Sequence, residues 1–257
     1  LWPSQAKNPK AGIRKEIRQR HAGWDVIFLD DQTVVPMPMA MQGLQFRITP
    51  SQMEVNQGII SVDPWLQHLS PPRLEANAVR LVDAEGRPLR TRIKMLREQV
   101  NGVFGANVRE IPALNLVRWF RKRRVKKGDS FLLTIEDWES GRYRLEHEPA
   151  AARHDAEVAR WDAAFADRVF AMLEHAYNEN IPTRLAITTT HARMRTFQTY
   201  PGHHWTTIIK DDPRMRDDGY EIRYSDAPTS GSLPPYEQPI DQVAFTPEEG
   251  QQVYRFK

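Results

Sequence analysis

Seven of the ten residues from Arg118 to Lys127 are lysine or arginine, and none of the ten is acidic. On a helix, the apolar residues of this run would face a core, and four cations would point outward: Arg118, Arg121, Lys122 and Arg124. Like charges at three- or four-residue spacing repel each other, so a purely solvent-facing helix rarely concentrates them. The run therefore favours a role in contacting phosphate groups, with an ordinary solvated helix face as the alternative.

Motifs of the common catalytic sites are missing from the sequence. It has no glycine-rich dinucleotide fingerprint, Walker loop or serine-hydrolase elbow. The absence of cysteine excludes a disulfide framework, a thiolate metal site and a cysteine nucleophile. The adjacent His203 and His204 would point apart on a strand, and the acidic residues between Asp211 and Glu221 are typical of a turn. We therefore expect no metal and no cofactor, and we favour a protein that is not an enzyme while leaving that point open.

Charge is distributed unevenly along the 257 residues. Residues 1–127 carry 22 basic and 11 acidic side chains and residues 128–257 carry 14 and 22, although the whole chain is only +3. This surplus predicts an anionic partner for the first half, either nucleic acid or a membrane surface. No stretch is long and apolar enough to span a membrane, and the opening residues lack the apolar core of a secretion signal. We expect a cytoplasmic protein associated with the nucleoid, or a nuclear one in a eukaryote.

Short elements separated by turn signals are expected up to residue 149. Residues 1–42 are predicted to form a basic N-terminal arm and linker, with an extended stretch over 33–41 because of its two prolines. Period-two alternation and turn residues predict mainly strands from residue 43 to residue 149. The expected strands cover 25–29, 44–49, 59–62, 78–82, 89–95, 131–136 and 142–146, and the expected helices cover 11–20, 65–69 and 113–124.

The remaining residues, 150–257, are predicted to form an α+β domain of unassigned role. Residues 155–177 have apolar side chains at three- and four-residue steps, the strongest helix signal in the chain. Residues 226–239 contain four prolines and are expected to be an irregular loop. Weaker strands or short helices are expected over 185–190, 205–209, 220–224 and 252–256. The apolar face of the long helix could also support a protein partner or self-association.

Four local strings follow one another in a fixed order between residues 43 and 148. They are Phe46–Met53 followed by Gly58–Val62, then Trp65–Pro72, then Val79–Arg92, and finally Leu116–Asp129 followed by Phe131–Ile135. In this order they resemble the B3-type DNA-binding pseudobarrel, known from plant transcription factors and from the recognition domains of some bacterial restriction endonucleases. Two features depart from the family. Pro88 or Leu89 stands where plant members have tryptophan, and the segment 97–111 is longer than the family's usual connection.

The resemblance implies a mainly β, α+β chain. A B3-like pseudobarrel with two short helices would occupy residues 43–149, and the α+β domain with its one long helix would follow over 150–257. It also implies sequence-specific recognition of double-stranded DNA through the major groove, in which two loop-bearing arms hold the duplex. Affinity would come from cations at phosphates, and base selection from arginine, lysine and amide side chains.

The resemblance further implies which residues contact DNA. The first arm would supply Arg47, Ser51, Gln52, Asn56 and Gln57. The second arm would supply Arg90, Arg92, Lys94 and Arg97, of which the first three alternate along an expected strand and project to one side. The outward cations of the basic helix would add phosphate contacts. An ordinary solvated strand face is the alternative for the second arm.

Two other functions compete with a DNA-binding regulator. The chain could be the recognition or effector component of a restriction endonuclease system, with cleavage in another chain or in residues 150–257. It could also carry a B3-like barrel that serves as a protein-interaction module without binding DNA.

Overall fold

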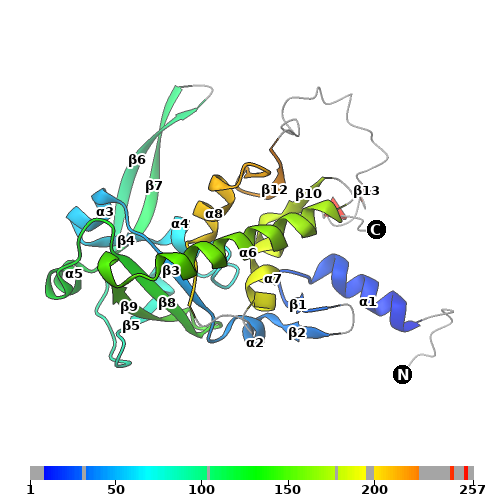
Figure 1. The fold of residues 1–257 in the computed structure, drawn as a ribbon, viewed down its shortest axis with the longest axis horizontal. Helices are drawn as coiled ribbons and strands as arrows, with labels where there is room; N and C mark the ends of the chain where they lie inside the picture. The colour runs from blue at the N-terminus through cyan, green and yellow to red at the C-terminus, as the bar shows by residue number, and fades with distance from the viewer. Residues whose placement is uncertain are drawn as a thin grey trace.

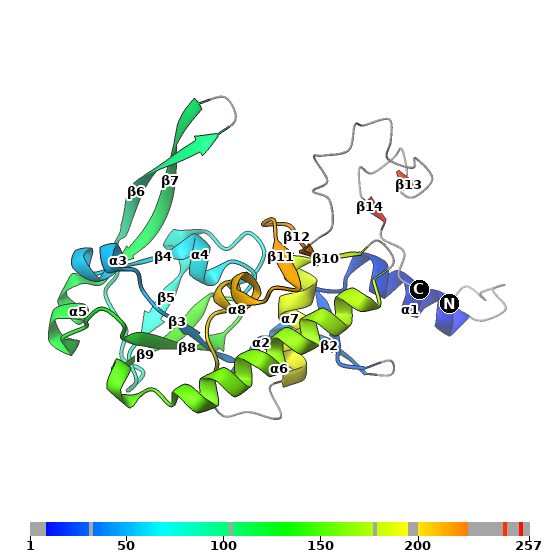
Figure 2. The same cartoon turned by 45° about the horizontal axis from the view of Figure 1, so that its top comes forward.

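The computed structural model describes residues 9–30, 33–102, 105–176, 179–194, 200–225, 244–245 and 252–253. It is a mixed α+β molecule, which confirms the predicted fold class (Figure 1). The basic helix α5 (Val117–Arg123) lies at one end of the molecule and the N-terminal helix α1 (Pro9–Arg20) at the other (Figures 1 and 2). None of the described helices has the length and apolar character needed to cross a bilayer.

Residues 33–41 form ordered elements instead of an extended linker. Strand β2 (Val34–Pro36) pairs antiparallel with β1 (Val26–Phe28), and helix α2 (Met37–Met41) follows directly. Pro38 is compatible with this helix because it lies in the first turn, where no intrahelical N–H donor is needed. Methionines at both ends of α2 are buried in the core, so the linker prediction was wrong here.

Two sheets make up the unit between residues 43 and 149. One has the strand order β3-β8-β9-β5 and the other has the order β4-β7-β6, and the described strands do not close into a barrel. The predicted hairpin is confirmed, since β8 pairs antiparallel with β9. The strands are β3 (Gln45–Ile48), β4 (Ile59–Ser61), β5 (Arg80–Val82), β6 (Ile93–Gly102), β7 (Gly105–Asn115), β8 (Ser130–Asp137) and β9 (Arg142–Glu148). The helices that connect them are α3 (Gln52–Gln57), α4 (Val62–Leu66), η1 (Ala76–Ala78) and α5.

Strands β6 and β7 form a long two-stranded ribbon that projects from the body (Figures 1 and 2). A connection over 97–111 was expected there, and that expectation was wrong. The ribbon was not predicted from periodicity because apolar side chains on one of its faces are not buried in a core: Met95 is 49% exposed and Val108 is 65% exposed. Residues 113–115 belong to β7, so the basic helix begins only at Val117.

The expected hairpin between residues 78 and 95 forms only next to its turn, where Val82 and Pro88 make an isolated antiparallel bridge and the Leu89 amide donates to the Leu81 carbonyl at 2.8 Å. Strand β5 pairs in parallel with β9, and the second strand begins only at Ile93. The turn itself forms as predicted, since the Asp83 amide donates to the Arg87 carbonyl at 2.9 Å.

Helix α6 (Asp155–Glu174) confirms the strongest helix prediction and buries the predicted face. The expected element over 185–190 lies within helix α7 (Thr183–Met194), and that over 205–209 lies within helix α8 (Trp205–Asp211). The expected loop over 226–239 lies outside the described residues. The remaining elements are η2 (Ala150–Ala152) and the strands β10 (Asn180–Pro182), β11 (Met215–Asp217), β12 (Glu221–Tyr224), β13 (Ala244–Phe245) and β14 (Gln252–Val253).

The hydrophobic core runs without interruption across the position where the two domains were expected to divide. Phe46 and Phe131 of the β unit belong to the same cluster of buried side chains as Phe165 and Trp205 of the C-terminal half. A hydrogen bond of 3.1 Å between His204 Nε2 and the Trp65 carbonyl also joins the two halves. The described residues between 150 and 225 therefore share a core with the β unit.

Candidate nucleic-acid interface

Helices α3 and α5 meet at Gly58, which ends α3 in the left-handed conformation with φ 63°. A Cβ atom at this position would lie 2.7 Å from the Val117 Cα, so only glycine fits. The Leu116 amide also donates to the Gly58 carbonyl at 2.8 Å. The end of one helix is thereby fixed against the start of the other, and their exposed side chains share one surface.

Helix α3 is held in place by Glu54, which the sequence analysis did not select. Its buried carboxylate accepts hydrogen bonds from the Ser61 amide and the Trp65 indole, both at 2.9 Å. It also accepts from the Ser51 amide at 2.8 Å, while the Ser51 hydroxyl accepts from the Glu54 amide at 3.2 Å. This reciprocal pair is a capping box, and the spacing Ser-x-x-Glu could have revealed it. Ser51, which was predicted to contact DNA, therefore caps helix α3.

The outward surface of α3 presents amide side chains. Gln52 donates to Asn56 at 2.7 Å across one helical turn, and both are exposed. Gln57 accepts a hydrogen bond of 2.6 Å from the Lys94 ammonium of β6. The structure thus brings predicted residues of the first and second arms into direct contact.

Arg90 and Arg92 lie in the segment before β6, so their predicted alternation along a strand was wrong. Both side chains are exposed. The Asn115 amide donates to the Arg92 carbonyl at 2.9 Å, which places Arg92 beside the start of α5. Arg92 therefore lies near the junction of α3 and α5.

Helix α5 buries Trp119 and Phe120, as its pattern predicted, and turns its cations outward. It ends at Arg124, whose φ of 56° is left-handed. Exposed cations continue past that end. The exposed basic residues of this run are Arg118, Arg121, Lys122, Arg124, Lys126 and Lys127. We call these six residues, together with Gln52, Asn56, Gln57, Arg90, Arg92 and Lys94, the basic end surface.

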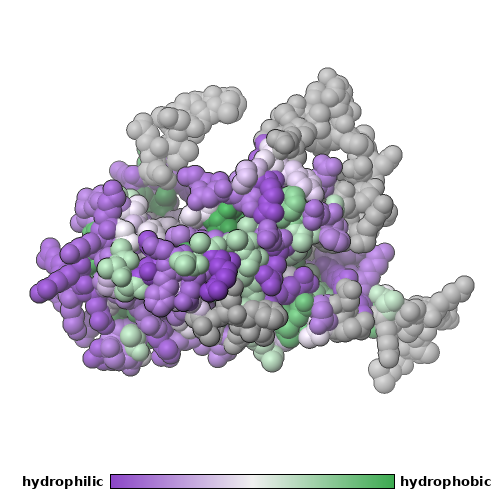
Figure 3. Space-filling view, viewed as in Figure 1, coloured by the Kyte–Doolittle hydropathy of each residue, from purple (hydrophilic) through white to green (hydrophobic). Residues whose placement is uncertain are grey.

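The six cations of the run differ from many others in having no counter-ion in the described part of the chain. No described carboxylate lies within 4.0 Å of their side-chain nitrogens. Elsewhere in the β unit, Arg87 pairs with Asp83 at 2.8 Å and Arg144 with Glu136 at 2.6 Å. Residues of hydrophilic character cover this end of the molecule in the view of Figure 3. The basic end surface therefore retains uncompensated positive charge.

Arg97 lies on the ribbon and is already paired. Its Nε is 3.2 Å from Glu110 on the opposite strand, although the arginine side chain is 78% exposed. The pairing partly neutralises the charge of Arg97. Arg97 therefore adds less net positive charge to the molecular surface than the unpaired cations do.

Arg47 is buried, and its prediction as a DNA contact was wrong. Its guanidinium forms a two-pronged pair with Glu148, with both N–O distances at 3.0 Å. It also donates to the carbonyls of Pro201 and Gly202 and lies 4.8 Å from the Tyr200 ring centroid. The alternation of β3 placed Arg47 on a solvent face, but the segment 200–202 covers that face. We call Arg47, Glu148 and residues 200–202 the buried arginine network.

Arg47→Met should destabilise the fold without removing a DNA contact. The substitution leaves Glu148 buried without its counter-ion, so the free energy of unfolding should fall by about 3–5 kcal/mol. Urea unfolding measures this loss, and Arg47→Met combined with Glu148→Leu should recover part of it. Unchanged stability together with lost duplex binding would contradict this structural role.

Within the described residues, no three histidine or acidic side chains are grouped so as to hold a metal ion. Comparison with protein families found no family model that matches this chain. No curated protein and no solved structure matches it either. The basic end surface is therefore the feature of the molecule that bears most directly on its function.

Proposed function

We propose that the protein binds double-stranded DNA through the basic end surface. The observation that carries the proposal is the run of six exposed cations without described counter-ions, placed beside the exposed amides of α3. Binding of cations to DNA phosphates releases condensed counter-ions and supplies most of the affinity. The likeness of residues 43–148 to B3-type domains supports the same proposal.

The two kinds of side chain on this surface have separate roles in the proposal. The cations of α5 contact phosphates and position the duplex, which requires no particular base sequence. The amides of Gln52 and Asn56 can pair with the N6 and N7 atoms of adenine in the major groove. The hydrogen bond from Lys94 to Gln57 places one further cation, from β6, beside the amides of α3. The amides of α3 therefore supply base selection, and α5 supplies affinity.

The dependence of affinity on salt tests the proposal. The full chain is titrated with a fluorescein-labelled random duplex, and the association constant is measured by anisotropy at several salt concentrations. About six phosphate contacts predict a log–log slope near −5, because each contact on duplex DNA contributes about −0.9. A flat response, or no binding at low salt, contradicts the proposal and favours the protein-interaction module. Cleavage of the duplex when Mg²⁺ is added would indicate the restriction component instead.

A further inference from the structure

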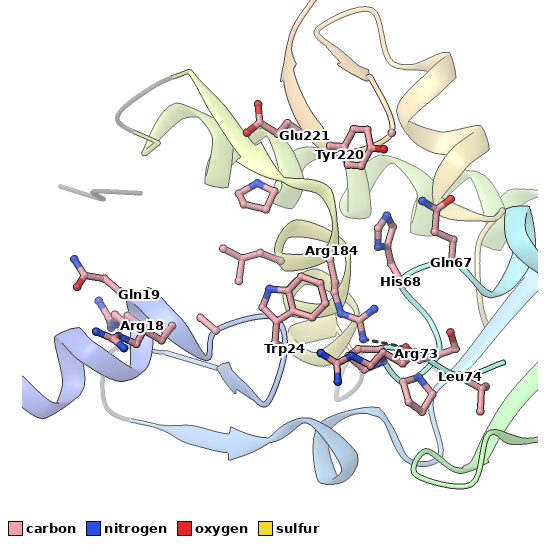
Figure 4. A pocket seen from close by; sticks show the side chains of 18 residues that line it. Arg18, Gln19, Trp24, Gln67, His68, Arg73, Leu74, Arg184, Tyr220 and Glu221 are labelled. Atoms are coloured by element: carbon pink, nitrogen blue, oxygen red, sulfur yellow. Dashed lines mark hydrogen bonds between the residues drawn. The ribbon is translucent and has the colours of Figure 1, made fainter. Parts of the chain in front are cut away.

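A cavity of about 1070 Å³ opens between α1, the segment from Gln67 to Leu74 and the turn before β12 (Figure 4). It lies away from the basic end surface, because α1 and α5 occupy opposite ends of the molecule (Figures 1 and 2). Its wall contains four guanidinium groups and one carboxylate, Glu221. The guanidinium groups belong to Arg18, Arg20, Arg73 and Arg184. Arg20 is already paired with Glu16 on the same helix. The preference of this wall for an anionic ligand therefore depends mainly on Arg73 and Arg184.

Arg184 is a buried cation with no described counter-ion. Its side chain lies in the wall of the cavity, where the residue is only 8% exposed. It donates to the Gly23 carbonyl at 3.0 Å and to the Ser70 carbonyl at 2.9 Å, but no described carboxylate lies within 4.0 Å. Burial lowers the pKa of Arg184 to about 10, which leaves it charged at neutral pH. A buried charge of this kind is stabilised when an anion pairs with it.

Two aromatic rings border the same cavity and remain largely exposed. Trp24 is 53% exposed and Tyr220 is 85% exposed. Figure 4 shows Trp24 beside Arg184, whose guanidinium carbon lies 5.1 Å from the indole centroid. Exposed rings beside cations are the combination that proteins use to stack nucleobases and hold their phosphates.

Arg73 and His68 complete the polar part of the wall. Arg73 is exposed and has a left-handed backbone with φ 68°, a conformation that costs free energy for a non-glycine residue. His68 also has a positive φ, of 66°, and its Nε2 atom has no hydrogen-bond partner among the described residues. Strained residues at a cavity rim are typical of ligand-binding segments.

We propose that this cavity binds a nucleoside phosphate, with the base stacked on Trp24 and the phosphate held by Arg184 and Arg73. An acidic peptide would satisfy the guanidinium groups but would leave the exposed rings without a planar partner. The volume is ample for one nucleotide. The ligand is either a free nucleotide or one nucleotide unit of a single-stranded nucleic acid.

Calorimetric titration of the full chain tests the proposal. The probes are adenosine 5′-monophosphate, adenosine, inorganic phosphate, a hexathymidylate strand and a hexaglutamate peptide. The monophosphate should bind at least about tenfold more tightly than adenosine or phosphate alone, because only it uses both the ring and the cations. Binding of the hexathymidylate strand that is tighter than that of the monophosphate and is weakened by Trp24→Ala identifies single-stranded nucleic acid as the source, because phosphate contacts at the basic end surface do not use Trp24. Equal or weaker binding identifies free nucleotide.

Two variants connect the binding to this cavity. Trp24→Ala should weaken monophosphate binding by about 5- to 150-fold, the range of one lost stacking contact. Arg73→Asn removes a cation while keeping a residue that tolerates the left-handed conformation, and it should weaken the monophosphate more than adenosine. Arg160→Gln, at an exposed position on α6, is the matched control. It should change neither the affinity for the monophosphate nor the affinity for adenosine.

Three results would overturn the proposal. The first is no saturable binding of the monophosphate or the hexathymidylate strand. The second is binding of hexaglutamate that is as tight as that of the monophosphate and is weakened by Arg73→Asn. The third is unchanged monophosphate binding in folded Trp24→Ala and Arg73→Asn. Thermal melts establish that the variants are folded. Duplex binding by the basic end surface should be unaffected by both, so failure of one proposal is distinguishable from failure of the other.

Discussion

Replacing Arg118, Arg121 and Lys122 together by alanine should weaken duplex binding roughly 500-fold at about 0.1 M salt. Each cation that no longer meets a phosphate removes about 0.9 from the slope of the salt dependence, so the slope should shrink by about 3. The three residues lie inside α5, where alanine is a better helix former, so the fold should not be weakened. Arg124 is left intact because its φ of 56° would strain an alanine. Anisotropy titrations over a salt series measure both quantities.

The matched control removes the same charge from elsewhere on the molecule. Arg160, Arg168 and Lys210 are exposed on α6 and α8, and their replacement by alanine should change affinity only a few-fold through the weaker overall field. Equal losses in the two triple variants would show that net charge, and not the surface at α5, determines binding. The phosphate-contacting role of α5 would then be wrong.

Mild acid should unfold the protein, because three histidines are buried in their neutral form. Burial lowers the pKa from its usual 6.5 to about 3 for His191 and His204 and to about 4 for His68. Both ring nitrogens of His191 lack described hydrogen-bond partners, and its ring lies 4.9 Å from that of Phe165. Protonating His191 or His204 in the folded protein places a charge in the core, and protonating His68 places a charge near Arg184 in the wall of the cavity.

The direction of the effect follows from which state binds protons. Since the folded pKa values are depressed, the unfolded chain takes up protons first as the pH falls below 6.5. The stability is therefore fully present above that pH and is lost below it. At about pH 5 each histidine should have lowered the free energy of unfolding by about 2 kcal/mol, and the three together by about 6 kcal/mol. Few marginally stable proteins tolerate such a loss.

Urea unfolding at several pH values between about 7 and 5 measures this dependence. His191→Phe fits among the neighbouring aromatic rings and should lower the pH dependence by about one third. Most carboxylates titrate below this window, so they contribute little to the slope. A free energy of unfolding that stays constant across the window would contradict the buried neutral state of these histidines.

Elements with strong periodicity were predictable from the sequence. The apolar spacing of α6 and the turn signals between β8 and β9 depend only on neighbouring residues, and both were confirmed. Helix α7 was ambiguous because it is buried on nearly every side, so its sequence shows no polar face. The ribbon of β6 and β7 was missed for the opposite reason, since its described apolar residues Met95 and Val108 are exposed.

The candidate surface was predictable in composition and less so in detail. The outward cations of α5 follow from the local spacing of Trp119 and Phe120, and they lie where predicted. Arg47 could not be assigned correctly, because Glu148 lies 101 residues further along the chain. No local sequence pattern indicates an ion-pair partner at that separation along the chain. The junction at Gly58 was also beyond prediction, since it depends on the packing of Val117.

The buried arginine network has a consequence for the order in which the protein can mature on the ribosome. Arg47 and Glu148 can meet once Glu148 has emerged from the ribosome, but the carbonyls of Pro201 and Gly202 follow about 50 residues later. Until then Arg47 lacks two hydrogen-bond acceptors, and the face of β3 that residues 200–202 cover remains exposed to solvent. The N-terminal half of a nascent chain should therefore reach its final form only after the segment that contains Pro201 and Gly202 has been synthesised.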